Sequence, residues 1–230
     1  MCTAHCTMNF HSVELFYIAI AAVVRARDDF ERRHDLTDDA LSAILLAAAA
    51  GEAFVNELAA NIRMHDSAAR DWSPISEAVR ACASAIEEAE ISREGIDAKF
   101  KHAARALDAG WRGAGALPFQ DFVRLLKLRN AIVHLKPSMH DTTAAIVTEL
   151  GQRIRLADDK LPWLNRVMTP EVAFWAVSTS RRVALEILAL TPEHAIPEFD
   201  QLHWLKRSLR QFRGLDGVES VWPDHYPRTE

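Results

Sequence analysis

The sequence contains few of the residues that interrupt regular structure. Only 8 glycines and 9 prolines occur among 230 residues, and no alternating polar and apolar stretch is long enough to predict a strand. Much of the 49% hydrophobic share is alanine, which favours helices. The composition excludes disorder over most of the chain, and it predicts an all-α helical bundle with one domain as the starting interpretation.

Cysteine is also scarce. Cys2, Cys6 and Cys82 are odd in number, and two of them stand close to the first residue, which does not fit a secreted disulfide framework. A reducing compartment fits better, so we expect a cytoplasmic protein. Cys2 and Cys6, with His5 and His11, offer zinc ligands, but their spacing fits no compact site, and no metal site is predicted.

The N-terminal apolar run, Leu15–Val24, covers about half of the ~20 residues that span a bilayer, and charged residues follow it at once. It also lacks the basic start and the cleavage site of a signal peptide. We interpret it as a buried helix and expect no membrane partner.

Positive charge is not in excess. The chain has 27 basic and 32 acidic residues, a formal net charge of −5, so no global field attracts nucleic acid or an anionic membrane surface. Any RNA contact would depend on a local basic patch. Glycine-rich phosphate loops, Gly-x-Ser-x-Gly elbows, dinucleotide fingerprints and paired-cysteine motifs are absent, so no cofactor is expected.

Helical periodicity and helix-breaking residues divide the chain into segments. The second helix is apolar nearly all round and should be central, whereas the third and fourth are more polar. We divide the chain into an N-terminal helix that can pack on the core (1–36), a helical core (37–190) and a C-terminal basic helix with a tail (191–230). The expected helices cover approximately residues 13–32, 38–64, 76–90, 92–109, 118–134, 170–190 and 199–212, with a short one inside 141–155 and a connection over 158–169.

The helix that Pro118 opens ends in the sequence Arg-Asn-Ala-Ile-Val-His, residues Arg129–His134, and Pro137 stops it. At a helix C-terminus the partial negative charge suits a protonated imidazole. Asn130 and His134 share a helix face, whereas Arg129 lies ~140° round the axis from His134 at ~100° per residue. Arg129 therefore reaches round the helix, or the helix unwinds there, or Arg129 serves a partner's site.

The Arg129-Asn130 pair, followed after three residues by His134, resembles the arginine, polar residue, spacer and histidine signature of HEPN-domain ribonucleases. Residues 50–58, Ala-Gly-Glu-Ala-Phe-Val-Asn-Glu-Leu, and the helix over 170–190 are similar to the frame of uncharacterised bacterial HEPN proteins, a likeness that runs from about Leu41 to Leu190. Members of this family have four-to-five-helix domains that dimerise so that two motifs face each other and cut RNA without a metal ion.

The resemblance implies a HEPN-like bundle with additional helices. It also implies a homodimeric, metal-independent endoribonuclease of defence, toxin–antitoxin or stress response, with RNA as substrate. A cognate inhibitor protein is left open as a partner.

The chemistry can be stated from the residue types. Metal-free RNA cleavage needs a base for the 2′-hydroxyl, an acid for the 5′-oxygen and a cation beside the phosphorane. His134 would act as acid or base, Arg129 would stabilise phosphate charge and Asn130 would position one or both, and a partner's copy would complete the set. Lys127 and Lys136 extend a small basic patch for RNA.

Two residues of the central helix are candidates for supporting this site. Glu52 and Asn56 are four apart and could orient Arg129 or His134, or Glu52 could be paired with an arginine for structure alone. A looser copy of the motif, from Arg27 to His34, is flanked by acidic residues that would repel a phosphate.

Three alternatives remain open. His134 and Arg129 could be an ordinary helix cap and a surface ion-pair residue. The chain could be a non-catalytic HEPN-like module that binds a protein or RNA, or an unrelated helical bundle. The basic run from Lys99 to Arg112 is interpreted as a solvated face.

Overall fold

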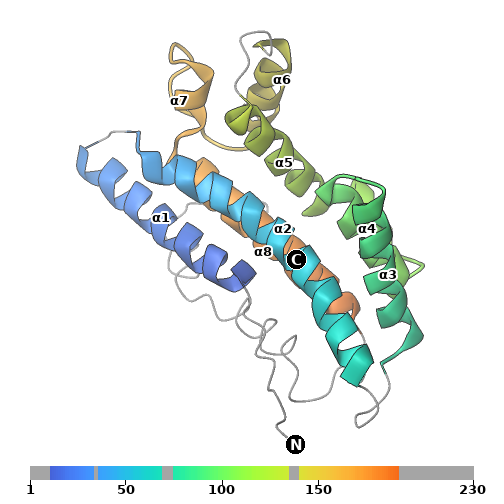
Figure 1. Cartoon of the computed structure of the whole chain (residues 1–230). Helices are drawn as coiled ribbons and strands as arrows, with labels where there is room; N and C mark the ends of the chain where they lie inside the picture. Colours follow the sequence, from blue (N-terminus) through green and yellow to red (C-terminus); the bar gives the residue numbers. More distant parts are fainter. Residues whose placement is uncertain (1–10, 34–35, 69–74, 135–139, 192–230) are drawn as a thin grey trace, which may run out of the picture.

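The computed structural model describes residues 11–33, 36–68, 75–134 and 140–191 (Figure 1). These residues form eight α-helices, one 3-10 turn and no strand, so the predicted all-α class is confirmed. In chain order the elements are α1 (His11–Arg33), α2 (Asp38–Ala68), α3 (Glu77–Ile91), α4 (Ile96–Leu107), η1 (Gly113–Gly115), α5 (Phe119–Val133), α6 (His140–Gly151), α7 (Trp163–Val167) and α8 (Pro170–Leu190).

The longest helix, α2, lies at the centre, as its apolar composition predicts. It contacts α1 and α8 along its length and also contacts α3, α4 and α5. In Figure 1, α8 runs behind α2, with α1 on one side of this pair and α3, α4 and α5 on the other. The site discussed below depends on this central helix, because α5 packs against both α2 and α8.

Within the described residues, α2 is also the one helix long and apolar enough to cross a membrane, by length and composition alone. The central helix of a helical bundle passes the same test. Of the apolar window in Asp38–Ser67, 56% is buried inside the structure. Packing against the surrounding helices therefore accounts for the apolar character of α2.

The core has an aromatic centre where α2, α4 and α5 meet. Phe54 stacks on Phe100 with ring centroids 6.0 Å apart, and Phe100 meets the edge of Phe122 at 4.8 Å. Gly51 lies against the same ring: a β-carbon there would stand 2.7 Å from both Phe122 Cε2 and Ser180 Oγ. Glycine at this position permits the close approach of α2 to α5 and α8.

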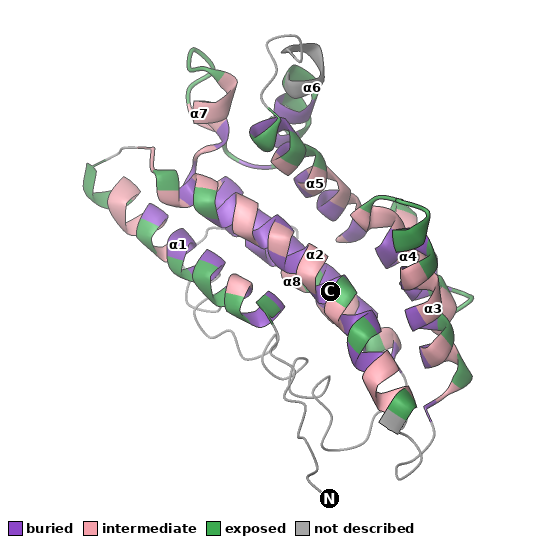
Figure 2. Cartoon of the chain, viewed as in Figure 1, coloured by how far each residue is buried: buried purple, intermediate pink, exposed green. Residues whose placement is uncertain are grey.

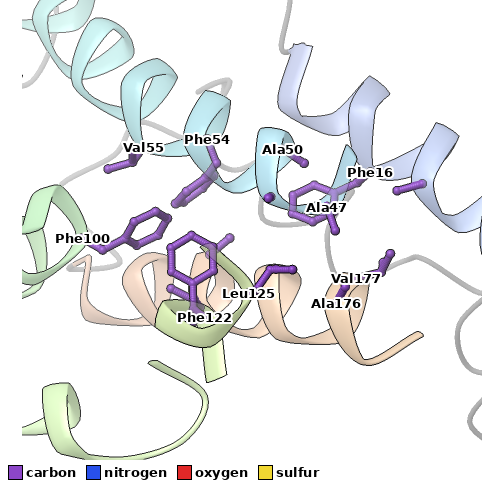
Figure 3. Close-up of a cluster of buried hydrophobic side chains, with 14 of the residues drawn as sticks. Phe16, Ala47, Ala50, Phe54, Val55, Phe100, Phe122, Leu125, Ala176 and Val177 are labelled. Atoms are coloured by element: carbon purple, nitrogen blue, oxygen red, sulfur yellow. The ribbon is translucent and has the colours of Figure 1, made fainter. Parts of the chain in front are cut away.

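Small residues continue the contact between α2 and its long neighbours. Figure 3 shows Ala47 and Ala50 of α2 beside Phe16 of α1 and the pair Ala176 and Val177 of α8. All five are fully buried. Figure 2 shows the same pattern over whole helices, with buried residues where α1, α2 and α8 meet and exposed residues on their outer faces. The N-terminal helix therefore packs on the core and shares it.

Several helix ends follow from capping chemistry. The Ser76 and Thr169 side chains accept hydrogen bonds from the backbone N–H groups of Val79 and Val172, at 3.4 and 3.3 Å. The prediction of one helix over 92–109 is wrong at its start. Residues 92–95 form a turn in which Arg93 has φ of 55°, and α4 begins only at Ile96.

The region after α5 departs from the prediction in two places. The helix expected inside 141–155 is α6, which ends at Gly151. The predicted connection over 158–169 contains the five-residue helix α7, which is too short for periodicity to reveal. The predicted helix over 199–212, with most of the segment 191–230, lies outside the described residues.

Candidate functional site

The candidate site lies at the C-terminal end of α5, because of the way apolar residues are spaced along that helix. Phe122, Leu125, Leu128 and Ile132 return every three or four residues and are buried against α2 and α8. On the other side of the helix, Lys127 and Asn130 are exposed. Figure 1 shows α5 running from the α4 end of the molecule to the end where α6 begins. The motif is thus presented on the surface by a well-buried helix.

His134 is the residue at which this helix stops, as predicted from Pro137. Its backbone has φ −108° and ψ 42°, outside helical geometry, and its N–H donates to the carbonyl of Asn130 at 2.9 Å. The side chain is exposed, and it forms no hydrogen bond with a described residue. The imidazole is therefore accessible to a ligand or to a partner subunit.

Arg129 is held by two neighbours. Its Nη1 donates to Asn130 Oδ1 at 3.0 Å, and its Nη2 lies 3.6 Å from Glu52 Oε2 on α2. The side chain of Arg129 is 32% exposed and that of Glu52 is 40% exposed, so water reaches this ion pair. The structure brings together Arg129, Asn130 and Glu52, while His134 stands one turn further along.

Asn56, the second supporting residue expected on α2, belongs to a different cluster. Its Oδ1 accepts a hydrogen bond from Lys99 Nζ at 2.9 Å, and the same ammonium binds the Glu90 carboxylate. Lys99 is only 5% exposed, which explains why it has two oxygen partners. The prediction that Asn56 supports Arg129 or His134 is therefore corrected: it satisfies a buried lysine between α2, α3 and α4.

The basic patch expected along α5 is smaller than the residue count predicts. Arg124 donates to Asp121 at 3.0 Å and to Glu149 at 3.2 Å, so two carboxylates neutralise it. Lys127 is exposed and forms no ion pair within the described part of the chain. Lys136 lies outside the described residues. The remaining local positive charge is concentrated on Lys127 and Arg129.

The other candidate groups from the sequence do not form comparable sites. Arg27, which begins the looser copy of the motif, is paired with Asp28 at 2.9 Å, and His34 lies outside the described residues. In the basic run near α4, Lys101 pairs with Asp97 at 2.9 Å. Lys99, Lys101 and His102 all have carboxylate partners. Lys101 and His102 are partly exposed, but Lys99 is buried, so the interpretation of this run as a solvated face is wrong for Lys99.

The N-terminal cysteines and His5 lie outside the described residues. His11 is near Glu14, with Nδ1 and Oε2 3.6 Å apart. Within residues 11–33, 36–68, 75–134 and 140–191, no group of three or more histidine, cysteine or acidic residues could hold a metal ion.

Two features of the site were not predicted from the sequence. Val133 is apolar, yet it is 53% exposed. Val133 is three residues from Asn130 and four from Arg129, so helical spacing places it on the same face as these two polar residues. Asp121 is nearly buried and binds both Arg124 and Arg153, which ties α5 to the end of α6. Arg153 is distant in sequence, so spacing could not reveal this link.

Cys82 carries the one thiol among the described residues, and this thiol is unreactive. Cys82 is fully buried in α3, and burial raises its pKa to about 12. A thiol of this kind is neither a nucleophile nor a metal ligand near neutral pH.

No family model, curated protein or solved structure matches this chain. The case for function therefore depends on the residues at the end of α5 and their neighbours on α2. They comprise an accessible imidazole, a guanidinium fixed by an amide, and an exposed apolar side chain, Val133.

Proposed function

We propose that the chain is a HEPN-type endoribonuclease that cuts RNA without a metal ion and acts as a homodimer, in defence, toxin–antitoxin or stress response. The observation that carries the proposal is the hydrogen bond from Arg129 to Asn130 beside an accessible His134, all at one exposed helix end. The resemblance of the Arg129–His134 segment to the family signature supplies the reaction class.

In the proposed reaction, the imidazole of His134 removes the proton from a ribose 2′-hydroxyl, and the 2′-oxygen attacks the adjacent phosphorus. The bond from phosphorus to the 5′-oxygen breaks, and that oxygen takes a proton from a second imidazole. The products are a 2′,3′-cyclic phosphate and a 5′-hydroxyl. Arg129 stabilises the negative charge that develops on the phosphorane oxygens.

The need for a second imidazole explains why the proposal includes a homodimer. One protomer supplies one His134, and in the family that the motif resembles the second imidazole comes from the partner's copy of the motif. A two-fold pairing that brings two α5 ends together would supply base and acid from opposite subunits. The exposed Val133 is suited to the apolar centre of such an interface.

The test is cleavage of a labelled mixed-sequence RNA in EDTA by the wild-type protein and by His134→Ala. Removing a general acid–base group costs about a hundredfold to ten-thousandfold in rate. We therefore expect cutting by the wild type and a loss of that order in the variant, with both proteins equally folded by circular dichroism. Cleavage that is undiminished in His134→Ala would overturn the proposal.

The second candidate function is a non-catalytic module of the same fold that binds a protein or RNA. It is favoured by the neutralisation of Arg124 and Arg129 by carboxylates on a chain of net charge −5. Failure of both proteins to cut any RNA, combined with retained RNA binding or capture of a defined partner, would favour this module over the nuclease.

A further inference from the structure

The ion pair between Arg129 and Glu52 bears directly on how a phosphate could reach this site. The two charged groups are 3.6 Å apart, beyond hydrogen-bond length, and both are in contact with water. Exposed ion pairs of this kind are weak. The hydrogen bond that fixes Arg129 is the one to Asn130, at 3.0 Å. Glu52 is therefore not needed to hold the guanidinium in place.

A guanidinium presents five N–H donors in a planar fork, and the Asn130 side chain takes one of them, on Nη1. The Glu52 carboxylate lies beside Nη2 without a hydrogen bond. A phosphodiester that binds through two N–H donors on the Nη2 side would meet this carboxylate, and the two anions repel each other. An RNA phosphate that binds Arg129 on this side must therefore displace Glu52.

The local charge balance makes this competition matter. Arg124 is neutralised by Asp121 and Glu149, so it adds little attraction for a polyanion. If Glu52 neutralises Arg129 as well, Lys127 is left as the one described lysine or arginine on this part of α5 without a carboxylate partner. Before RNA binds, the positive charge that the described residues on this part of α5 present is then about that of Lys127 alone.

We propose that Glu52 is an internal competitor of RNA at Arg129: its carboxylate neutralises the guanidinium in the free protein and is displaced by a phosphodiester. The inference rests on the proposed function, because it assigns Arg129 to phosphate. It makes Glu52 a residue that sets RNA affinity, and not a catalytic residue.

The test uses Glu52→Gln, which keeps the shape of the side chain and removes its charge. Binding of a labelled mixed-sequence RNA is measured in EDTA with His134→Ala in every protein, so that cleavage cannot interfere. Removing one negative charge ~6 Å from a phosphate should tighten binding roughly threefold to tenfold at low salt. The gain should shrink as salt rises, because the pair is exposed.

Two further proteins make the result specific. In proteins that also carry Arg129→Gln, Glu52→Gln should increase RNA affinity no more than a control substitution that removes one negative charge elsewhere. Glu88→Gln is that control: Glu88 is exposed on α3, at the other end of the molecule from α6 (Figure 1), and pairs with no described residue. Thermal unfolding of all variants checks that each is folded.

Tighter binding that requires Arg129 supports the competitor role. Weaker or unchanged binding by Glu52→Gln overturns it, and so does an equal gain when Arg129 is absent. In those cases the cleavage test with His134→Ala still decides the proposed function on its own. If none of the proteins binds RNA, the competitor role is overturned, and the cleavage test again decides the proposed function separately.

Discussion

At the scale of single residues, the three side chains at the end of α5 are held to different degrees. Arg129 is bound to Asn130 and lies beside Glu52, whereas His134 ends the helix with its imidazole in solvent. The Arg129 guanidinium is held by a hydrogen bond, whereas the His134 imidazole can reorient. This combination suits a site that a second subunit completes. The sequence predicted a partner for Glu52, either at the motif or in a structural pair with an arginine, because an unpartnered carboxylate on an otherwise apolar helix is costly.

Other parts of the site could not be predicted at this scale. Asn56 was expected beside the motif, but the buried Lys99 needs an oxygen partner and takes the Asn56 side chain. Lys99 is 43 positions from Asn56 in the sequence. Helical spacing places a residue on a face, but it does not show which of two polar neighbours across the interface will bind it.

Cys82 provides a first prediction at the residue scale. A pKa raised from 9.0 to about 12 leaves roughly a thousandfold less thiolate at pH 8 than an exposed thiol has. Iodoacetamide should therefore leave Cys82 unmodified in the native protein and modify it rapidly in urea. Peptide mass spectrometry after timed labelling measures both rates, and equal rates in the two states would show that this core position is open to solvent.

The ion pair between Glu87 and Arg63 provides a prediction for pH. The side-chain hydrogen bond from Arg63 lowers the pKa of the Glu87 carboxyl. The unfolded chain therefore binds a proton more readily, so the stabilisation is complete above the unfolded pKa of ~4.3 and is lost as pH falls through the lower folded value. Both side chains are about 40% exposed, so the contribution is below ~1 kcal/mol.

Urea unfolding of the wild type and Glu87→Gln tests this. We expect the variant to be slightly less stable at pH 7 and the difference to vanish near pH 3. Glu88→Gln is the matched control, since Glu88 is exposed next to it and pairs with no described residue. A difference that persists unchanged at acid pH would show that the charge of Glu87 is not its cause.

At the scale of elements, the crossing of α2 with α5 and α8 depends on Gly51. A β-carbon there would lie 2.7 Å from the buried ring of Phe122 and from Ser180 Oγ. Overpacking costs about 1–3 kcal/mol, whereas replacing glycine by alanine inside a helix gains about 1 kcal/mol, so Gly51→Ala should lose up to about 2 kcal/mol net. Urea unfolding followed by circular dichroism measures the change.

A second variant isolates the steric cause. Phe122→Leu is itself destabilising because it removes a buried ring, but it leaves space beside residue 51. In that background Gly51→Ala should cost less stability than in the wild type, because only the contact with Ser180 Oγ remains. A loss of stability that is the same in both backgrounds would show that the ring does not limit the approach of the helices.

The helices themselves were largely predictable, because long apolar periodicities and N-terminal caps set them. The helices α2 and α8 begin at Asp38 and Pro170, where the sequence predicted them. The Thr169 side chain caps α8, whereas the Thr37 hydroxyl forms no hydrogen bond with a described residue. The errors fall on short elements: α7 has five residues, and the turn before α4 uses a left-handed Arg93 where glycine would have been the expected signal.

At the scale of the whole molecule, one buried core includes residues from Val13 in α1 to Leu188 in α8. The segment over residues 1–36 that the sequence separated from the core therefore contributes α1 to it. Few glycines and prolines, much alanine and no alternating pattern were together enough to predict the all-α class. The HEPN assignment is proposed from the Arg129–His134 motif, and the homodimer and RNA as ligand are proposed from the reaction that this motif implies.

The most direct test of the nuclease proposal compares two labelled RNAs of one mixed sequence, one unmodified and one fully 2′-O-methylated, incubated with the wild-type protein in EDTA. Attack by the 2′-oxygen predicts cleavage of the unmodified RNA alone, with 2′,3′-cyclic phosphate and 5′-hydroxyl ends identified by mass spectrometry. Cleavage of both RNAs, or cleavage that leaves 5′-phosphate ends, would contradict the mechanism assigned to Arg129 and His134.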